Sequence, residues 1–259
     1  MASAEDAILE THGLVKAFEG FVAVDGVSLR VRRGEIHALI GPNGAGKTTF
    51  FNLLTKFLRP TSGEIFFRGD NITREKPADI ARRGIVRSFQ ICAVFPHLTV
   101  LENVRVSLQR GLGTSFYFWR SDKSLASLDR RATQLLTEVR LEEWGHTLAG
   151  DLPYGRKRAL ELATTLALEP ELMLLDEPTQ GMGHEEVRYV TQLIRRVSAN
   201  RTVLMVEHNM SVVASIADTI SVLQRGRVIA VGPYTEVSKN PQVVEAYMGA
   251  SSVELAGAG

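Results

Sequence analysis

The chain has 259 residues, of which 44% are hydrophobic and 23% are charged. These values are typical of a folded, soluble globular protein and exclude a disulfide-stapled mini-protein, a collagen-like chain and a disordered chain. Thirty Lys and Arg residues against 29 Asp and Glu residues leave a net charge of +1, which lacks the basic excess of nucleic-acid-binding domains. We therefore expect no nucleic acid partner.

Residues 1–13 have neither a basic start nor an apolar run, so no secretory signal is expected. The apolar runs are far shorter than the roughly 20 residues that a membrane-spanning helix needs. The single cysteine, Cys92, cannot form an internal disulfide, which suits a reducing compartment. These features predict a cytoplasmic protein that docks at a membrane if it acts there.

The first predicted elements are strands. Apolar and polar residues alternate over residues 27–32, which is the period of a half-buried strand and predicts an antiparallel portion near the N-terminus. Four further apolar runs end abruptly in a polar residue or a glycine and are interpreted as buried, mostly parallel strands. These runs are residues 36–40, 85–89, 172–175 and 203–206.

Helical spacing lies between these strands, over about residues 100–168. From Leu125 to Val139, apolar residues recur at three- and four-residue steps with Arg130 and Arg131 on the opposite side, as in an amphipathic helix. We expect a helical insertion within an α/β domain. Residues 219–231, with a turn at 224–227, predict a closing hairpin.

The strongest motif connects the apolar run at 36–40 to a predicted helix, and it matches the phosphate-binding P-loop pattern. Its residues are Gly41, Pro42, Asn43, Gly44, Ala45, Gly46, Lys47 and Thr48, followed by Thr49. The glycines let backbone N–H groups surround phosphate oxygens, Lys47 adds a positive charge and Thr48 offers a hydroxyl to Mg²⁺. The alternative is a glycine-rich turn before an ordinary helix.

Two adjacent acids, Asp176 and Glu177, end the run at 172–175. In a P-loop protein this pattern predicts Asp176 on the metal and Glu177 on the attacking water, whereas without a P-loop it would be a strand followed by a solvated acidic turn. Gln90 and His208 also follow predicted strands. Since ligands of parallel α/β sheets gather at the carboxyl ends of the strands, we expect all these groups at one edge.

Three arginines precede Gln90. Arg82, Arg83 and Arg87 offer positive charge to RNA or to lipid headgroups. We interpret them instead as helix-end charges and as a solvated strand face.

These motifs resemble the ATP-binding subunit of an ABC transporter, and the resemblance extends to about Gly249. It is strongest with the ATPases of bacterial importers for branched-chain and other hydrophobic amino acids. The segments that carry this closer resemblance are residues 84–90, 98–104, 110–144, 207–210 and 240–249.

The resemblance implies a single α/β domain, residues 1–250, with a P-loop NTPase core of the ABC ATPase type. A mostly parallel sheet and an N-terminal antiparallel β portion would occupy about residues 1–98 and 169–235. An inserted helical subdomain would occupy about residues 99–168, and a C-terminal helix about residues 236–250. Residues 251–259 are expected to be a disordered tail because their small side chains bury little surface.

The resemblance also implies further site residues. Phe18 is similar to the aromatic that stacks on adenine, with a small core residue as the alternative. Gln90 would join Thr48 and Asp176 as a metal ligand, touch the catalytic water and sense the membrane subunit, and His208 would reach the γ-phosphate. The family signature, which closes over the nucleotide of the opposite subunit, corresponds to Leu152, Pro153, Tyr154, Gly155 and Arg156.

Three positions depart from the family pattern. Pro153 stands where most ABC ATPases have Ser, so a hydroxyl and a backbone N–H are missing, although proline suits the first turn of a helix. Arg156 replaces the usual Gln, and with Lys157 it makes a basic helix start that could face phosphate or lie in solvent. Gly183 stands where the D-loop normally has Asp or Asn. We expect two unequal sites in the dimer.

The resemblance implies a subunit that binds ATP and Mg²⁺ and hydrolyses ATP to energise import through closure of a head-to-tail dimer. The implied partners are transmembrane permease subunits, a second identical or related ABC ATPase, and, indirectly, an extracytoplasmic solute-binding protein, with the chain at the cytoplasmic face of the inner membrane. Two alternatives remain: a non-hydrolysing structural subunit, and a soluble ABC ATPase not linked to transport.

Overall fold

The computed structural model describes residues 6–88, 94–111 and 122–256. Gln90 and Cys92 lie outside these ranges. The strands are β1 (Ala7–Phe18), β2 (Phe21–Arg32), β3 (Ile36–Ile40), β4 (Ser62–Phe67), β5 (Asp70–Asn71), β6 (Ile85–Arg87), β7 (Leu172–Asp176), β8 (Thr202–Val206), β9 (Thr219–Gln224) and β10 (Arg227–Gly232). The helices are α1 (Lys47–Leu54), α2 (Pro77–Arg82), α3 (Val100–Gly111), α4 (Asp122–Glu138), α5 (Tyr154–Leu166), α6 (His184–Val197), α7 (Met210–Ile216), α8 (Tyr234–Val237) and α9 (Pro241–Ala256).

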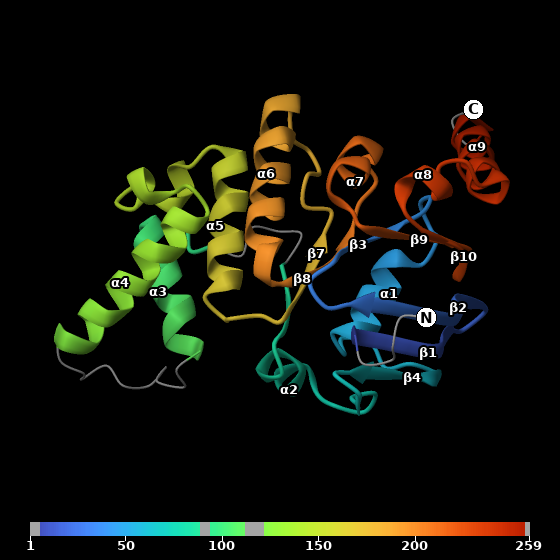
Figure 1. Cartoon of the computed structure of the whole chain (residues 1–259), viewed down its shortest axis with the longest axis horizontal. Helices are drawn as coiled ribbons and strands as arrows, with labels where there is room; N and C mark the ends of the chain where they lie inside the picture. The colour runs from blue at the N-terminus through green and yellow to red at the C-terminus, as the bar shows by residue number, and fades with distance from the viewer. Residues whose placement is uncertain (1–5, 89–93, 112–121, 257–259) are drawn as a thin grey trace.

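The larger sheet has the strand order β10-β9-β3-β8-β7-β6 (Figure 1). Neighbouring strands are parallel from β9 to β6, and β10 pairs antiparallel with β9, which confirms the mostly parallel sheet and the closing hairpin. Val206 of β8 aligns with Leu39 of β3 on one side and with Asp176 of β7 on the other. The carboxyl ends of these three strands therefore lie next to one another.

The smaller sheet is antiparallel, with the order β2-β1-β4-β5, and confirms the N-terminal antiparallel portion. In β2, Val27, Leu29 and Val31 are buried and the residues between them are exposed, as their alternation predicts. Phe50 and Phe51 of α1 belong to the same buried cluster as these valines, so α1 packs between the two sheets.

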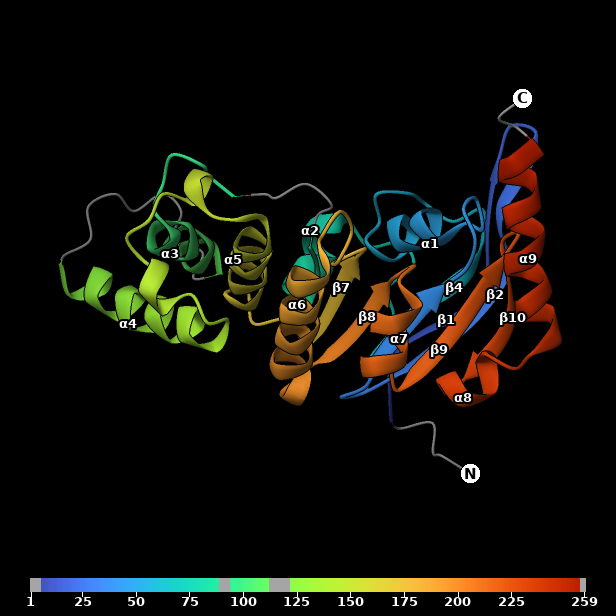
Figure 2. The same ribbon diagram turned by 90° about the horizontal axis from the view of Figure 1, so that it is seen from above.

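The helical subdomain comprises α3, α4 and α5, and these helices fall within the stretch predicted to be helical. Viewed from above, the three helices lie on the far side of α6 from α1 (Figure 2). Buried residues of α3, α4 and α5 nevertheless share one cluster with α6 and the larger sheet. The subdomain is thus packed onto the core through α5 and α6.

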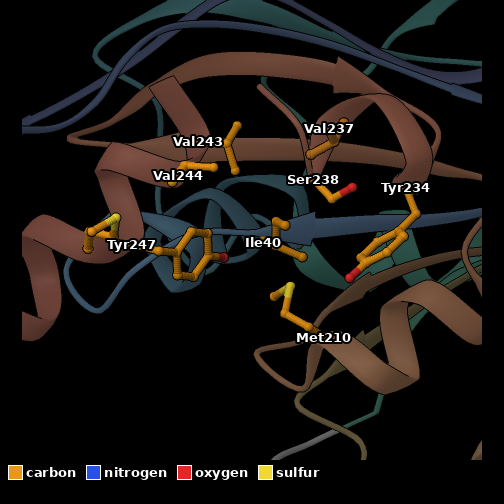
Figure 3. A pocket seen from close by; sticks show the side chains of 9 residues that line it. Ile40, Met210, Tyr234, Val237, Ser238, Val243, Val244 and Tyr247 are labelled. Atoms are coloured by element: carbon orange, nitrogen blue, oxygen red, sulfur yellow. The ribbon is translucent and has the colours of Figure 1, made fainter. Parts of the chain in front are cut away.

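The C-terminal helices α8 and α9 enclose a cavity of about 300 Å³ against the carboxyl end of β3 and the start of α7 (Figure 3). Ile40, Met210, Tyr234, Val243 and Tyr247 are among its lining residues. Burial raises the pKa of Tyr247 to about 12, although a hydrogen bond with the backbone of Gly41 opposes that increase. The last helix therefore contacts the backbone of the phosphate loop.

Helix α9 continues to Ala256 and does not end at residue 250 as expected. The residues after 250 include Glu254, Leu255 and Ala256, which are strong helix formers, and neither glycine nor proline occurs from 251 to 256. The small residues of segment 251–259 therefore did not predict where this helix ends. None of the helices in the described ranges is long and apolar enough to cross a membrane.

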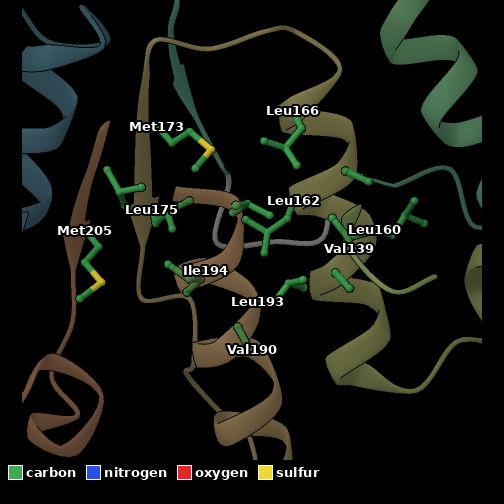
Figure 4. Close-up of a cluster of buried hydrophobic side chains, with 14 of the residues drawn as sticks. Val139, Leu160, Leu162, Leu166, Met173, Leu175, Val190, Leu193, Ile194 and Met205 are labelled. Carbon is green, nitrogen blue, oxygen red and sulfur yellow. The ribbon is translucent and has the colours of Figure 1, made fainter. Parts of the chain in front are cut away.

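Alternating residues of β7 face different layers, because successive side chains of a strand point to opposite faces. Leu172 and Leu174 belong to the cluster around α1, whereas Met173 and Leu175 belong to the cluster that includes α5 and α6 (Figure 4). All four side chains are fully buried. The strand that carries Asp176 is thus fixed by apolar packing on both faces.

Candidate nucleotide site

The phosphate loop lies between β3 and α1 in a conformation that requires glycine. Gly41 has a φ of 151° and Gly46 a φ of 102°. A Cβ at Gly41 would overlap the carbonyl oxygen of Leu223, and a Cβ at Gly46 would overlap that of Ala23. These close backbone contacts need a residue without a side chain, so the glycines of the motif have a steric role as well as a conformational one.

Lys47 is buried at the first turn of α1. Its Nζ donates hydrogen bonds to the carbonyl oxygens of Gly41 at 2.6 Å and Pro42 at 3.0 Å. Burial lowers the pKa of Lys47, while the charges of Glu177 and Asp176 oppose that effect. The structure therefore brings the lysine of the phosphate loop and the two acids after β7 within electrostatic range of each other. Thr48 is exposed beside Lys47, and Thr49 is half-buried.

Asp176 ends β7 with a side chain that is only 1% exposed, and it forms an ion pair with Arg87 of β6. Arg87 also donates to Asn52 Oδ1 of α1 at 2.6 Å, and its guanidinium lies 5.8 Å from the ring centre of Phe51. The side chain of Arg87 is 11% exposed, so its assignment to a solvated strand face was wrong. Its partners come from the neighbouring strand and from α1, which local sequence cannot reveal.

The second carboxylate oxygen of Asp176, Oδ1, is buried and makes no hydrogen bond within the described ranges. Among those same residues, no group of three or more His, Cys, Asp and Glu side chains could hold a metal. Mg²⁺ commonly binds through one or two carboxylates together with substrate phosphates and water. The free oxygen of Asp176 and the exposed hydroxyl-bearing Thr48 fit that mode of binding.

Glu177 follows Asp176 with a φ of 47°, a left-handed conformation that is unusual for a residue with a side chain. Its backbone N–H donates to the carbonyl oxygen of Val206 at 2.9 Å, which joins the ends of β7 and β8. Such a conformation costs about 1–2 kcal/mol and is frequent at functional sites. The chain therefore turns sharply at the residue predicted to act on water.

His208 follows β8, and its side chain is 56% exposed. The residue before it, Glu207, is buried and accepts hydrogen bonds from the backbone N–H groups of His208 at 2.7 Å and Asn209 at 3.2 Å. Thr179 donates to the other carboxylate oxygen of Glu207. Neither Glu207 nor Thr179 was among the predicted site residues. The available signal was an acid at the end of an apolar run, directly before His208.

Phe18 lies at the end of β1, beside the turn into β2. It is 39% exposed, which does not fit a core residue, and its ring stacks on Phe21 at 5.6 Å between centres. Lys16 Nζ lies 5.0 Å from the centre of the Phe18 ring. Phe21 belongs to β2, and Ala23 of the same strand lies close to Gly46 of the phosphate loop. The exposed pair of Phe18 and Phe21 therefore lies on the sheet that touches this loop.

The signature residues lie at the start of α5. Leu152 is buried, Pro153 directly precedes the helix, and Tyr154 is its first residue. Gly155 N–H donates to Glu186 Oε1 at 3.1 Å. Figures 1 and 2 show α6 and β7 between α5 and α1, so the signature and the phosphate loop of one chain are separate.

Arg156 is held between α6 and the segment that follows α4. Its guanidinium lies 4.5 Å from the ring centre of Tyr189 and 5.8 Å from that of Trp144, and it donates to Tyr189 Oη at 2.7 Å. Lys157 Nζ donates to the carbonyl oxygen of Gly150 at 2.8 Å. The basic start of α5 is therefore paired locally. At the D-loop, Gly183 N–H donates to Glu186 Oε2 at 3.3 Å, so Glu186 connects this loop to the signature.

Comparisons of the sequence with family profiles and with known proteins agree with one another. The sequence profile of the family described as ABC transporter matches residues 24–180, and that of the branched-chain amino acid ATP-binding cassette transporter matches residues 227–252. The high-affinity branched-chain amino acid transport ATP-binding protein BraF of Pseudomonas aeruginosa is 40% identical over 252 residues, which cover 93% of this chain and 98% of that protein. The similarly named LivG of Escherichia coli is 38% identical with the same coverage.

Solved structures show the same fold. The ADP conformation of an ATP-binding cassette of an ABC transporter has a TM-score of 0.82 at 31% identity and covers 94% of this chain and 99% of that one. A nucleotide-free cassette from an ABC transporter has a TM-score of 0.80 at 30% identity, covering 93% and 98%. These similarities confirm the predicted fold class. The relatives give no support to a structural subunit or to a role unlinked to transport.

Proposed function

The chain belongs to the ABC transporter family, and on that premise we propose that it is the ATP-hydrolysing subunit of an importer for branched-chain or other hydrophobic amino acids. The observation that carries this proposal is the grouping of Lys47, which follows β3, with Asp176 and Glu177 at the end of β7, the two strands that flank β8. The solute rests on the names of the relatives alone, since an ATPase of this kind does not contact it.

In the proposed reaction, Lys47 and the backbone N–H groups of residues 41–49 bind the phosphates of ATP. Thr48 and Asp176, together with Gln90, would hold Mg²⁺, which would neutralise charge on the phosphates when bound. Glu177 orients the attacking water or removes its proton, and His208 stabilises charge that develops at the γ-phosphate. Phe18 stacks on the adenine.

The proposed active assembly is a head-to-tail dimer. The signature residues of one chain lie away from its own phosphate loop, which supports a role in covering the loop of a second chain. Excluding water from such a site strengthens its electrostatic interactions. The second chain would be an identical copy or a related ATPase, and Pro153 and Gly183 favour unequal sites.

The proposed setting is the cytoplasmic face of the inner membrane, where the chain attaches to permease subunits. The membrane spans would then belong to those subunits, and a solute-binding protein would act from outside the membrane. Purification of the tagged chain from native membranes tests this setting. Recovery without any membrane partner would contradict it.

The decisive experiment replaces Glu177 with Gln. We expect Glu177→Gln to keep ATP affinity and to lose about a hundred- to ten-thousand-fold in turnover, the usual effect of removing a general base. Nucleotide binding and phosphate release are measured in the assembled complex. The control is Glu169→Gln, which changes a surface acid whose side chain is 77% exposed. Undiminished hydrolysis by Glu177→Gln would contradict the assignment.

A further inference from the structure

A buried carboxylate lies between the two loops that carry Glu177 and His208. Glu207 has no exposed side-chain surface and directly follows β8. A buried polar group is costly unless it is hydrogen-bonded. Each oxygen of this carboxylate has a partner, and the partners belong to different segments of the chain.

The first oxygen, Oε1, accepts the hydroxyl of Thr179. Thr179 is itself buried and lies two positions after Glu177, in the turn that follows β7. The backbones of these segments are also joined, because Glu177 N–H donates to the carbonyl oxygen of Val206. The side-chain bond is thus a second connection between the same two strand ends.

The second oxygen, Oε2, accepts the backbone N–H groups of His208 and Asn209. It also lies 3.6 Å from His208 Nδ1. Asn209 Oδ1 in turn accepts the N–H groups of Ser211 and Val212 and caps α7. The backbone around His208 is therefore fixed on both sides, while its side chain stays 56% exposed.

We propose that Thr179 and Glu207 form a positioning bridge, which holds His208 in register with Glu177 at the nucleotide site. The proposal rests on the proposed ATPase function and extends it to two residues that have no assigned role in that function. Charge-assisted hydrogen bonds to backbone N–H groups are short and directional, so the bridge fixes the point from which the imidazole projects. A displacement of about 1 Å in such a group can reduce a rate by roughly a hundredfold.

The first test uses Thr179→Val, which keeps the shape of the side chain and removes the hydroxyl. We expect kcat to fall by about ten- to a hundredfold while KM for ATP is unchanged, because the bridge does not contact the phosphate loop. Thr179→Ser restores the hydroxyl and should recover most of that loss. An unchanged kcat in Thr179→Val, or a failure of Thr179→Ser to restore the rate, would overturn the bridge.

A matched control separates positioning from stability. Thr202, at the other end of β8, is also a buried threonine, and its hydroxyl oxygen accepts the N–H of Gly34 at 3.0 Å. We expect Thr202→Val to lower the unfolding midpoint while kcat per folded molecule stays at the wild-type value. If Thr202→Val reduced kcat as much as Thr179→Val, the loss would be a general effect of destabilisation and the proposal would be wrong.

A double-mutant cycle tests whether Thr179 and Glu207 act as one unit. Glu207→Met removes the acceptor, and Thr179→Val removes the donor of the same hydrogen bond. We expect the double variant to lose no more activity than the more impaired single variant, because the second substitution finds the bond already broken. Losses that multiply would show independent roles and overturn the bridge.

Hydrogen exchange gives a readout that does not depend on ATP turnover. Without nucleotide, the N–H groups of His208 and Asn209 should exchange slowly in the wild type and in Thr202→Val, and faster in Thr179→Val. Equal exchange in all three proteins would contradict the bridge whatever the activity. Slow exchange in a wild-type protein that lacks ATPase activity in its complex would instead contradict the proposed function.

Discussion

At the scale of single residues, Lys56 carries a clear energetic penalty. It follows α1 in a left-handed conformation with a φ of 63°, and its buried Nζ makes no hydrogen bond to any residue described in the structure. Burial lowers the pKa of Lys56 to about 8, although the charge of Glu75 opposes the decrease. A buried lysine with a lowered pKa destabilises the folded state as long as it is protonated in the unfolded chain.

We therefore predict that Lys56→Met stabilises the protein by up to about 3 kcal/mol at pH 7. Folded Lys56 loses its proton near pH 8 and unfolded lysine near pH 10.5, so the wild-type penalty is complete below pH 8 and shrinks as the pH rises between those values. The advantage of Lys56→Met should thus disappear by about pH 10.5. Urea unfolding of both proteins at several pH values measures the difference between their free energies of unfolding.

The matched control is Lys239→Met, which removes an exposed lysine. It should change the free energy of unfolding by less than about 0.5 kcal/mol at every pH. A Lys56→Met variant that is no more stable than the wild type at pH 7 would show that the buried amine has a partner in solution.

Functional residues that belong to short sequence motifs were predictable from the sequence. The glycines and Lys47 of the phosphate loop, and the acids Asp176 and Glu177, follow from spacing within short motifs. Arg87 and Glu207 were not predictable in the same way, because their partners lie on neighbouring strands or in other loops. Hydrogen bonds across a sheet leave no local pattern in the sequence.

At the scale of secondary-structure elements, Arg87 connects three of them. It extends from β6 to Asp176 at the end of β7 and to Asn52 of α1. The ion pair is almost fully buried, so removing one partner leaves an uncompensated charge. Through this one side chain, helix α1 and strand β7 are both connected to β6.

We predict that Arg87→Met lowers the free energy of unfolding by about 3–5 kcal/mol, since Asp176 would be left buried without its ion-pair partner. Adding Asp176→Asn should recover part of the loss because the unpaired charge is then removed. The control is Arg82→Met, whose side chain is 79% exposed and whose pairing with Asp79 should contribute less than about 1 kcal/mol. Equal losses in Arg87→Met and Arg82→Met would rule out a stabilising role for the buried pair.

Strands were the most predictable elements. The apolar runs at 36–40, 172–175 and 203–206 became β3, β7 and β8 because a fully buried strand must be apolar on both faces. Of the run at 85–89, residues 85–87 form β6 and Ser88 lies beyond the strand, whereas Phe89 lies outside the described residues. The two-residue strand β5 carries no periodic signal and escaped prediction.

At the scale of the whole molecule, the chain has a sheet core with the phosphate loop and a helical subdomain with the signature. The two regions lie on different sides of α6 and β7 (Figure 2). In the proposed head-to-tail dimer, one copy would supply the phosphate loop of each site and the other copy would supply the signature residues. The helical insertion was predictable from periodicity, whereas the contact of α9 with Gly41 joins distant parts of the chain and was not.

We predict that purified Glu177→Gln dimerises with ATP and Mg²⁺ because bound nucleotide persists and bridges two chains. The molar mass from light scattering should double on adding ATP and should not change on adding ADP. Glu177→Gln with Lys47→Ala should remain monomeric, since the phosphates lose their buried cation. A monomer that retains bound ATP would contradict pairing of identical copies and favour a related ATPase as the mate.

The alternation of side chains along β7 also has a genetic consequence. Inserting or deleting one codon in this strand would exchange the layers that Leu174 and Leu175 face, and would turn the following carboxylate away from Arg87. Insertions or deletions of a single codon should therefore be absent among functional variants within these five codons. Substitutions of one apolar residue by a similar one should be tolerated there.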